Sequence, residues 1–197
     1  MTESANVKKV IDEADSGVIK TGEVSAAGLH RSVLRQLSDE GAIYRYSRGI
    51  YVRSDAWEDE FYLLQQKYSR GIFSHETALY LWDYSDRTPA KLCMTFPQGY
   101  NAPSLKQENV MVKRAIKENY SLGLTQVKSP CGNPIFVYDL ERTLCDILKG
   151  NGSDIQIINA AMKRYVASNE KNINRLMEYA KQLRVKAKVL HYMEVLL

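Results

Sequence analysis

The stretch TGEVSAAGLHRSVLRQLSDEGAIYRYSRGIYVR, residues 21–53, decides the fold of the first part of the chain. It begins with a short helical segment that Thr21 is expected to cap and that gives way to a turn at Gly28. A second helical segment, roughly Arg31 to Glu40, ends at Gly41, where a left-handed residue commonly closes a helix. Two helices joined by a tight turn that contains glycine predict a helix-turn-helix.

One more helix and a hairpin flank this pair. Upstream, apolar residues recur at helical spacing over residues 7–11, so we expect a helix that ends near Gly17, with residues 18–20 as a short apolar link. Downstream, two short β-prone runs flank a turn at Ser47-Arg48-Gly49, which predicts a β-hairpin. A hairpin directly behind a helix-turn-helix is a wing, so the segment is predicted to be a winged helix-turn-helix.

The two sides of the helix over residues 31–40 differ in character. Val33, Leu34 and Leu37 gather on one side. The opposite side carries Arg31, Ser32, Arg35 and Asp39. A helix that packs on a core with one side and presents arginines on the other can read the major groove of DNA. Residues 24–38 include no acidic residue that would repel phosphates. The alternative is that these arginines are ordinary solvated charges.

The ordered combination of helices, glycine turn and arginine-tipped hairpin favours double-stranded DNA as a partner. Arg48 lies at the tip of the predicted hairpin, where it can reach a phosphate or the minor groove. The candidate DNA-binding residues are Thr21, Ser25, Arg31, Ser32, Arg35, Arg45 and Arg48.

The middle of the chain alternates helix and strand patterns. Apolar residues at positions 57, 61, 64 and 68 predict one face of an amphipathic helix, and Ser74 is expected to cap a second helix. Strands are expected over residues 91–96, 110–116, 122–127 and 135–138, and Asp139 is expected to cap a helix that stops near Gly150. The fold class is therefore α+β: a winged helix-turn-helix over 1–54 and a second domain over 55–197, with a mixed α/β part (55–152) and a helical bundle (153–197).

The helical end of the chain is its basic part. Residues 155–197 carry eight Lys or Arg against three Glu. A solvated basic face is one interpretation, and a face for nucleic acid or an acidic protein is the other.

Composition narrows the remaining possibilities. The chain has 197 residues, of which 45% are hydrophobic and 25% charged, which is typical of a globular protein, and its net charge of +4 permits an acidic partner. Its three cysteines lack CxxC spacing, so neither a disulfide framework nor a zinc site is expected. Without a signal peptide pattern or a long apolar run, a cytoplasmic protein that does not enter the membrane is expected.

No arrangement of residues suggests catalysis. Asp83 and Asp86 are expected in a loop, and Glu141 and Asp146 lie on different faces of one helix, so neither pair forms an acid–base dyad. Phosphate-binding glycine loops and zinc-protease motifs are missing from the sequence. We expect no enzyme activity, no cofactor and no metal, which argues against a nucleic-acid-processing enzyme.

Three segments together resemble the AbiEi antitoxins over nearly the whole chain. The first is the winged-helix run, with Ala27-Gly28-Leu29, Leu34-Arg35-Gln36-Leu37, Gly41, Tyr44-Arg45 and Arg48-Gly49-Ile50-Tyr51. The second is the run FSHETALYL at 73–81 with Thr95-Phe96-Pro97. The third is the run VYDLERTLCD at 137–146. Relatives often have a small polar cap before the recognition helix, where this chain has His30. The role of His30 is open between cap, base contact and neither.

The resemblance implies a bacterial two-gene system. Such an antitoxin represses its own promoter by binding inverted repeats, counteracts a nucleotidyltransferase-like toxin called AbiEii, and acts in abortive infection against phage. Its C-terminal domain is tied to antitoxin activity, which makes the basic residues there candidates for toxin neutralisation: Lys163, Arg164, Arg175, Lys181, Arg184, Lys186 and Lys188. The alternative is a winged-helix transcriptional regulator with a ligand-sensing α/β domain.

Overall fold

The computed structural model describes residues 11, 14 and 16–196. The helix predicted near residues 7–15 lies mostly outside these described residues. The chain divides into two compact units. The first unit comprises the chain up to Ser69 together with Ser129–Asn133, and the second comprises Arg70–Lys128 and Pro134–Leu197. The sequence predicts a boundary after residue 54, between a DNA-binding domain and an antitoxin domain, and this boundary stays a prediction.

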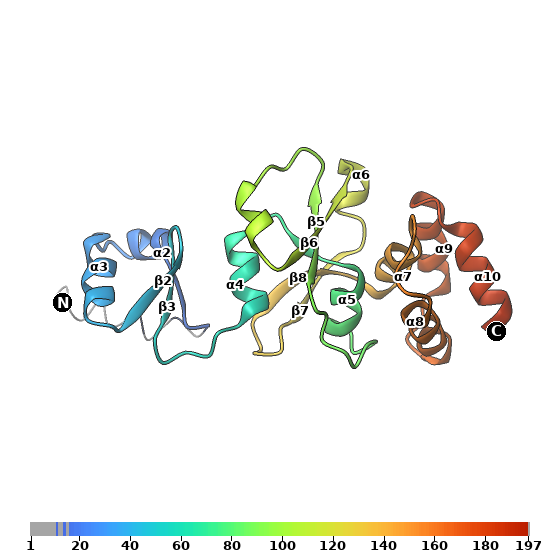
Figure 1. Ribbon diagram of the computed structural model, residues 1–197, viewed down its shortest axis with the longest axis horizontal. Coiled ribbons are helices and arrows are strands. Elements are labelled where there is room, and N and C mark those ends of the chain that lie inside the picture. The colour runs from blue at the N-terminus through green and yellow to red at the C-terminus, as the bar shows by residue number, and fades with distance from the viewer. Residues whose placement is uncertain (1–10, 12–13, 15, 197) are drawn as a thin grey trace. The chain divides into compact units, whose positions relative to one another are not determined.

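The first unit contains a helix-turn-helix and a three-stranded antiparallel sheet (Figure 1). Its elements are β1 (Val18–Lys20), α2 (Thr21–Ala26), α3 (Ser32–Asp39), β2 (Ile43–Ser47), β3 (Ile50–Arg53) and α4 (Glu60–Lys67). The sheet order is β1-β3-β2, and the hairpin β2–β3 is the predicted wing. Residues 18–20 are a strand and not the link expected from the sequence, because they pair with residues 50–52 of β3.

Both faces of this small sheet are covered. On one face Ile19 and Ile43 join Val24, Leu29 and Leu34 of the helical part in one apolar cluster. On the other face Val18, Ile50 and Val52 pack with Leu63 of α4. These clusters exclude water from both sides of the strands, which is the main source of stability for so small a sheet.

The helix α4 begins later than the apolar spacing predicted. Trp57, expected on its buried face, precedes the helix and is 91% exposed. Asp59 caps α4 instead, accepting a hydrogen bond from the Tyr62 amide at 3.0 Å. The Asp59 carboxylate, almost fully buried, also accepts hydrogen bonds from the Ser129 hydroxyl and from the Asn133 amide, the latter at 2.8 Å. Two segments far apart in sequence thereby meet within the first unit.

The second unit has a five-stranded mixed sheet in the order β6-β5-β4-β8-β7. Its strands are β4 (Ile72–Phe73), β5 (Leu92–Pro97), β6 (Val110–Ala115), β7 (Leu124–Lys128) and β8 (Pro134–Tyr138). The sequence predicted four of them and missed β4, which is antiparallel to β5 and parallel to β8. The shorter helical pieces are α5 (His75–Leu81), the 3-10 helix η1 (Pro103–Gln107) and α6 (Lys117–Tyr120).

The predicted C-terminal helices are present. They are α7 (Leu140–Leu148), α8 (Ile155–Ala167), α9 (Ile173–Gln182) and α10 (Lys186–Leu196). Figure 1 shows α8, α9 and α10, coloured orange to red, beside α7. Leu144, Met162, Leu176 and Val189 share their apolar core, to which α5 adds Leu79. In the described part of the chain, no helix is long and apolar enough to cross a membrane.

Candidate nucleic-acid interface

The turn between α2 and α3 is fixed by backbone geometry. Gly28 has φ +76°, a conformation that residues with a Cβ rarely adopt. The amides of Gly28 and Leu29 donate to the carbonyls of Ser25 and Val24, both at 3.1 Å. Because the Leu29 side chain is also buried in the apolar cluster of the first unit, the direction in which α3 leaves the turn is set.

His30 has a capping contact at the start of α3. Its Nδ1 accepts a hydrogen bond from the Ser32 amide at 3.3 Å and lies 2.8 Å from the Ser32 hydroxyl. Arg31 occupies the N-cap position, but its own side chain makes no capping hydrogen bond. The imidazole thus replaces the small polar cap, and Ser32 is held at the exposed first turn.

Three of the candidate DNA-binding residues are linked by hydrogen bonds that also reach the wing. Arg31 Nε donates to Ser25 Oγ at 3.4 Å, and that hydroxyl donates to the Thr21 carbonyl at 3.0 Å. The Thr21 amide donates to the carbonyl of Gly49, in the wing turn, at 2.9 Å. The start of α3 therefore lies beside the last turn of α2, and the start of α2 lies beside the wing turn.

The remaining candidates are exposed. Arg35 Nε lies 3.9 Å from Asp39 Oδ2, and the Arg35 side chain is 89% exposed, so this surface ion pair holds it only weakly. Arg45 Nε donates to the Ser47 carbonyl at 3.4 Å, and Arg48 is exposed in the wing turn. Among the described residues, no hydrogen bond links these three arginines to the Thr21–Ser25–Arg31 group.

The basic residues of the C-terminal helices fall into two groups. Arg175 Nη1 lies 3.7 Å from Glu141 Oε2, and Lys188 Nζ donates to the carbonyls of Leu148 and Gly150 at 2.8 and 2.9 Å. Arg164 lies over the ring of Tyr84, 5.2 Å from its centroid. These three side chains have structural contacts.

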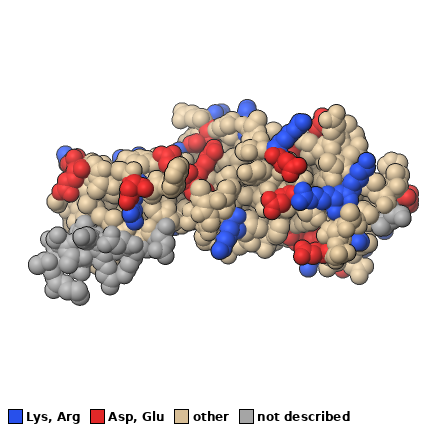
Figure 2. Space-filling view, turned by 90° about the horizontal axis from the view of Figure 1, so that it is seen from below, with Lys and Arg blue, Asp and Glu red and all other residues tan. Residues whose placement is uncertain are grey.

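The other group is free of such contacts. Within the described ranges, no ion pair or side-chain hydrogen bond is formed by the exposed residues Lys163, Lys181, Arg184 and Lys186. Figure 2 shows Lys and Arg side chains interspersed with Asp and Glu over the face in view. The sequence pattern did not reveal this division, because contact with a carbonyl or carboxylate depends on tertiary structure.

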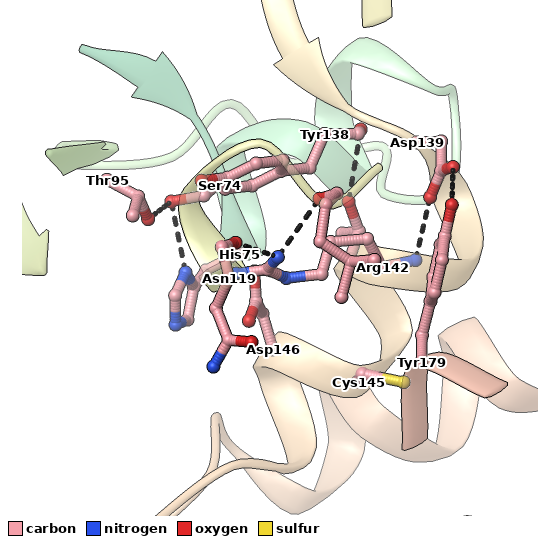
Figure 3. Close-up of polar contacts among 12 residues, drawn as sticks. Ser74, His75, Thr95, Asn119, Tyr138, Asp139, Arg142, Cys145, Asp146 and Tyr179 are labelled. Carbon is pink, nitrogen blue, oxygen red and sulfur yellow. Dashed lines mark hydrogen bonds and ion pairs between the residues drawn. The ribbon is translucent and has the colours of Figure 1, made fainter. Parts of the chain in front are cut away.

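A buried polar network surrounds α7 (Figure 3). Arg142, 2% exposed, pairs with Asp146, Nε to Oδ2 at 3.0 Å, and its Nη1 donates to the carbonyls of Asn119 and Leu122 at 2.5 and 3.0 Å. Its guanidinium also lies over the ring of Tyr138, 4.3 Å from the centroid. Burial raises the pKa of Asp146, and the charge of Arg142 opposes that shift. Tyr138, Arg142 and Asp146 belong to the run 137–146. The sequence pattern did not indicate that this run forms a buried polar network.

Glu141 and Asp139 connect the same helix to its neighbours. Tyr165 donates to Glu141 Oε1 at 3.1 Å and Tyr179 to Asp139 Oδ2 at 3.2 Å. Burial, with the adjacent Asp139 carboxylate, raises the pKa of Tyr179 to about 12. Among the described residues, no buried side-chain nitrogen or oxygen lacks a hydrogen bond. A fully satisfied network of this kind fixes the packing of the sheet on the helices.

The glycine turn, the exposed arginine-bearing helix and the two-stranded wing form a winged helix-turn-helix arrangement over residues 18–53. Residues 8–54 match the family model described as "Transcriptional regulator, AbiEi antitoxin". This match confirms the resemblance for the N-terminal segment, and the runs at 73–81 and 137–146 lie outside it.

A solved structure extends the likeness in fold. The chain is similar to the crystal structure of the RV2827C protein from Mycobacterium tuberculosis, with a TM-score of 0.64 at 15% identity, over 98% of this chain and 77% of that one. At this identity the likeness shows a shared fold. No curated protein matches the sequence.

Proposed function

We propose that this protein is the antitoxin and autorepressor of a bacterial two-gene system. It binds inverted repeats in its own promoter through the winged helix-turn-helix, and it counteracts a nucleotidyltransferase-like toxin of the AbiEii type. The hydrogen-bonded group of Thr21, Ser25 and Arg31, joined to the wing turn at Gly49, carries the DNA part of this proposal. It joins the two helices to the wing turn through hydrogen bonds.

The charge around this group supports contact with DNA. Arg31, Ser32 and Arg35 are exposed along α3, and residues 24–38 contain no carboxylate. Arg45 and Arg48 add exposed cations on the wing. A helix in the major groove with a wing on the backbone uses charges placed in this way.

Toxin neutralisation is assigned to the second unit. Of its predicted basic residues, Lys163, Lys181, Arg184 and Lys186 have side chains available for a partner. They could form charge-assisted contacts with an acidic toxin surface. Arg164, Arg175 and Lys188 support the fold through the contacts described above, so any role in neutralisation would come in addition.

Two assays of the full-length protein test the proposal. In gel shifts, the protein should bind its own promoter far more tightly than a scrambled duplex of equal length at the same salt concentration. In cells, co-expression with the product of the neighbouring gene should restore growth that this product alone prevents. A neighbouring gene product that is harmless, or toxicity that co-expression leaves unchanged, would refute the antitoxin part.

The neutralising surface has its own test. Reversal of Lys163, Lys181, Arg184 and Lys186 to Glu should abolish protection, while the matched reversal of Arg87, Lys106, Lys117 and Lys128 in the same unit should preserve it. Circular dichroism and thermal melting establish that both variants are folded. If the folded first variant protects cells fully, these four residues are only a solvated surface.

A further inference from the structure

The second unit contains a pocket of about 290 Å³ that neither promoter binding nor toxin neutralisation uses. Its wall is formed by the start of α5, the strands β5 and β6, and residues 149–154 around the loop between α7 and α8. The volume lies close to the lower end of the range for small-molecule sites, about 300–1,000 Å³. We propose that this pocket binds a small metabolite that carries a phosphate group.

The charges in the wall point to an anion. Lys91, Lys113 and Lys149 all line the pocket. Across the described part of the chain, none of their ammonium groups forms an ion pair with a carboxylate or a hydrogen bond. Lys113 and Lys149 also lie within electrostatic range of the Asp146 carboxylate, whose pKa burial raises and both lysines lower. Three lysines in one wall nevertheless raise the local concentration of anions and favour a negatively charged ligand. A phosphate meets this need better than a single carboxylate does.

Acidic residues also line the pocket, and one of the three is paired with a cation. Asp146 is paired with Arg142 at 3.0 Å. Asp154 caps α8 by accepting a hydrogen bond from the Gln156 amide at 2.7 Å. Glu76 is the third. With the charge of Asp146 balanced by Arg142, three lysines of the wall face two carboxylates, those of Glu76 and Asp154, so the wall keeps a net positive charge.

His75 supplies a neutral hydrogen-bonding group beside these cations. Its backbone has φ 53°, an uncommon conformation outside glycine that is often found at functional sites. Its Nδ1 lies 3.1 Å from Ser74 Oγ, and Figure 3 shows the ring beside Ser74 and Thr95. Burial, assisted by Lys113, Arg142 and Lys149, lowers the pKa of His75 to about 3. The imidazole is therefore uncharged at neutral pH.

The second ring nitrogen of His75 is open to the pocket. No hydrogen bond is formed by Nε2, and among the described residues no buried side-chain nitrogen is without one, so Nε2 must reach solvent. Ser153, half-buried on the loop wall, adds a hydroxyl. Lysine ammonium groups bind phosphate as point charges, and the imidazole and the hydroxyl can each donate a hydrogen bond to a phosphate oxygen.

Binding can be measured on the full-length protein. Isothermal titration with inorganic phosphate and with glycerol phosphate should show saturable binding, and thermal unfolding should shift upward with either ligand. Sodium chloride at matched ionic strength should produce no comparable shift. Tighter binding of glycerol phosphate identifies a phosphorylated metabolite as the occupant, and tighter binding of inorganic phosphate identifies the free ion.

Variants assign the binding to the pocket. Lys113→Gln and Lys149→Gln, combined, should weaken phosphate binding by at least about tenfold, because each removes a charge-assisted contact. The control pair Lys106→Gln and Lys117→Gln, exposed in the same unit, should bind as the unaltered protein does. Equal losses in both pairs, or a response to chloride equal to that to phosphate, would overturn the proposal.

The exposed Lys91 provides a second variant that should not disturb folding. If the combined variant fails to fold, Lys91→Gln should still weaken phosphate binding several-fold. A folded Lys91→Gln protein with unchanged affinity then counts against the site.

Discussion

The arginines of the first unit and the arginine at the centre of the second unit are the same residue type in opposite environments. Arg35 is 89% exposed beside a loosely placed carboxylate, whereas Arg142 is 2% exposed and has fixed partners on three sides. Exposed charge is available to a ligand, and buried charge is committed to the fold. A basic side chain therefore indicates function only after its contacts are known.

Removal of Arg142 should have the largest effect on stability. Arg142→Ala leaves Asp146 buried without its counter-ion, so the free energy of unfolding should fall by about 3–5 kcal/mol. Urea denaturation followed by circular dichroism measures the change. The exposed Arg87→Ala is the control and should stay within about 0.5 kcal/mol of the unaltered protein. Similar losses of stability in Arg142→Ala and Arg87→Ala would contradict the view that the buried arginine supports the fold and the exposed one does not.

Removal of Arg31 or Arg35 should spare stability and weaken DNA binding. Either change to Ala should cost about 1–3 kcal/mol of promoter affinity if the guanidinium contacts a base edge. Gel shifts on the protein's own promoter measure the loss, with Arg87→Ala as the control for total charge. A double variant that binds normally would show that α3 does not face DNA.

His75 extends the comparison to pH. Its pKa is about 3 in the folded protein, against an ordinary value of 6.5, so the unfolded chain binds a proton that the folded chain does not. The contribution of the neutral His75 to the free energy of unfolding is fully present above pH 6.5. It is lost as the pH falls toward 3, by up to about 1.4 kcal/mol per pH unit. His75→Asn, which tolerates the positive φ, should flatten this acid dependence. Denaturation at pH 7, 5.5 and 4.5 measures it, and parallel curves for the two proteins would contradict the assignment.

The wing should give the smallest effect. Arg48→Ala should weaken binding to all duplexes alike and reduce the slope of log K against log salt by about one. Gel shifts at several salt concentrations measure the slope. Arg53→Ala is unsuitable as a control, since Arg53 pairs with Asp55 at 2.7 Å, so Arg87→Ala serves again. An unaltered slope for Arg48→Ala would mean that the wing tip does not contact phosphate.

The winged helix could be predicted because its sequence signals are local. Gly28, Gly41 and Gly49 all have positive φ, and the elements begin and end where these glycines suggest. The strands β1 and β4 were missed because segments of three and two residues become strands only through their partners. Trp57 was misplaced because its spacing matched a helix that Asp59 starts later.

The sequence could not show which charged residues are buried or paired within the fold and which are exposed. Charged residues are seldom buried, so Glu141, Arg142 and Asp146 gave no sign of the network that they form. Arg175 and Lys188 looked like their exposed neighbours until their partners on α7 were known. Three of the DNA-binding candidates, Thr21, Ser25 and Arg31, are linked by hydrogen bonds in the structure. Their contact with DNA stays a prediction.

The hydrogen bonds of Asp59 have a consequence for modularity. Because Ser129 and Asn133 both donate to this buried carboxylate, the first unit is assembled from two separate stretches of chain. A gene fusion that transplanted only the leading 69 residues as a DNA-reading cassette would leave that carboxylate without two of its donors. A shortened version of the first unit that keeps α4 should therefore also keep residues 129–133.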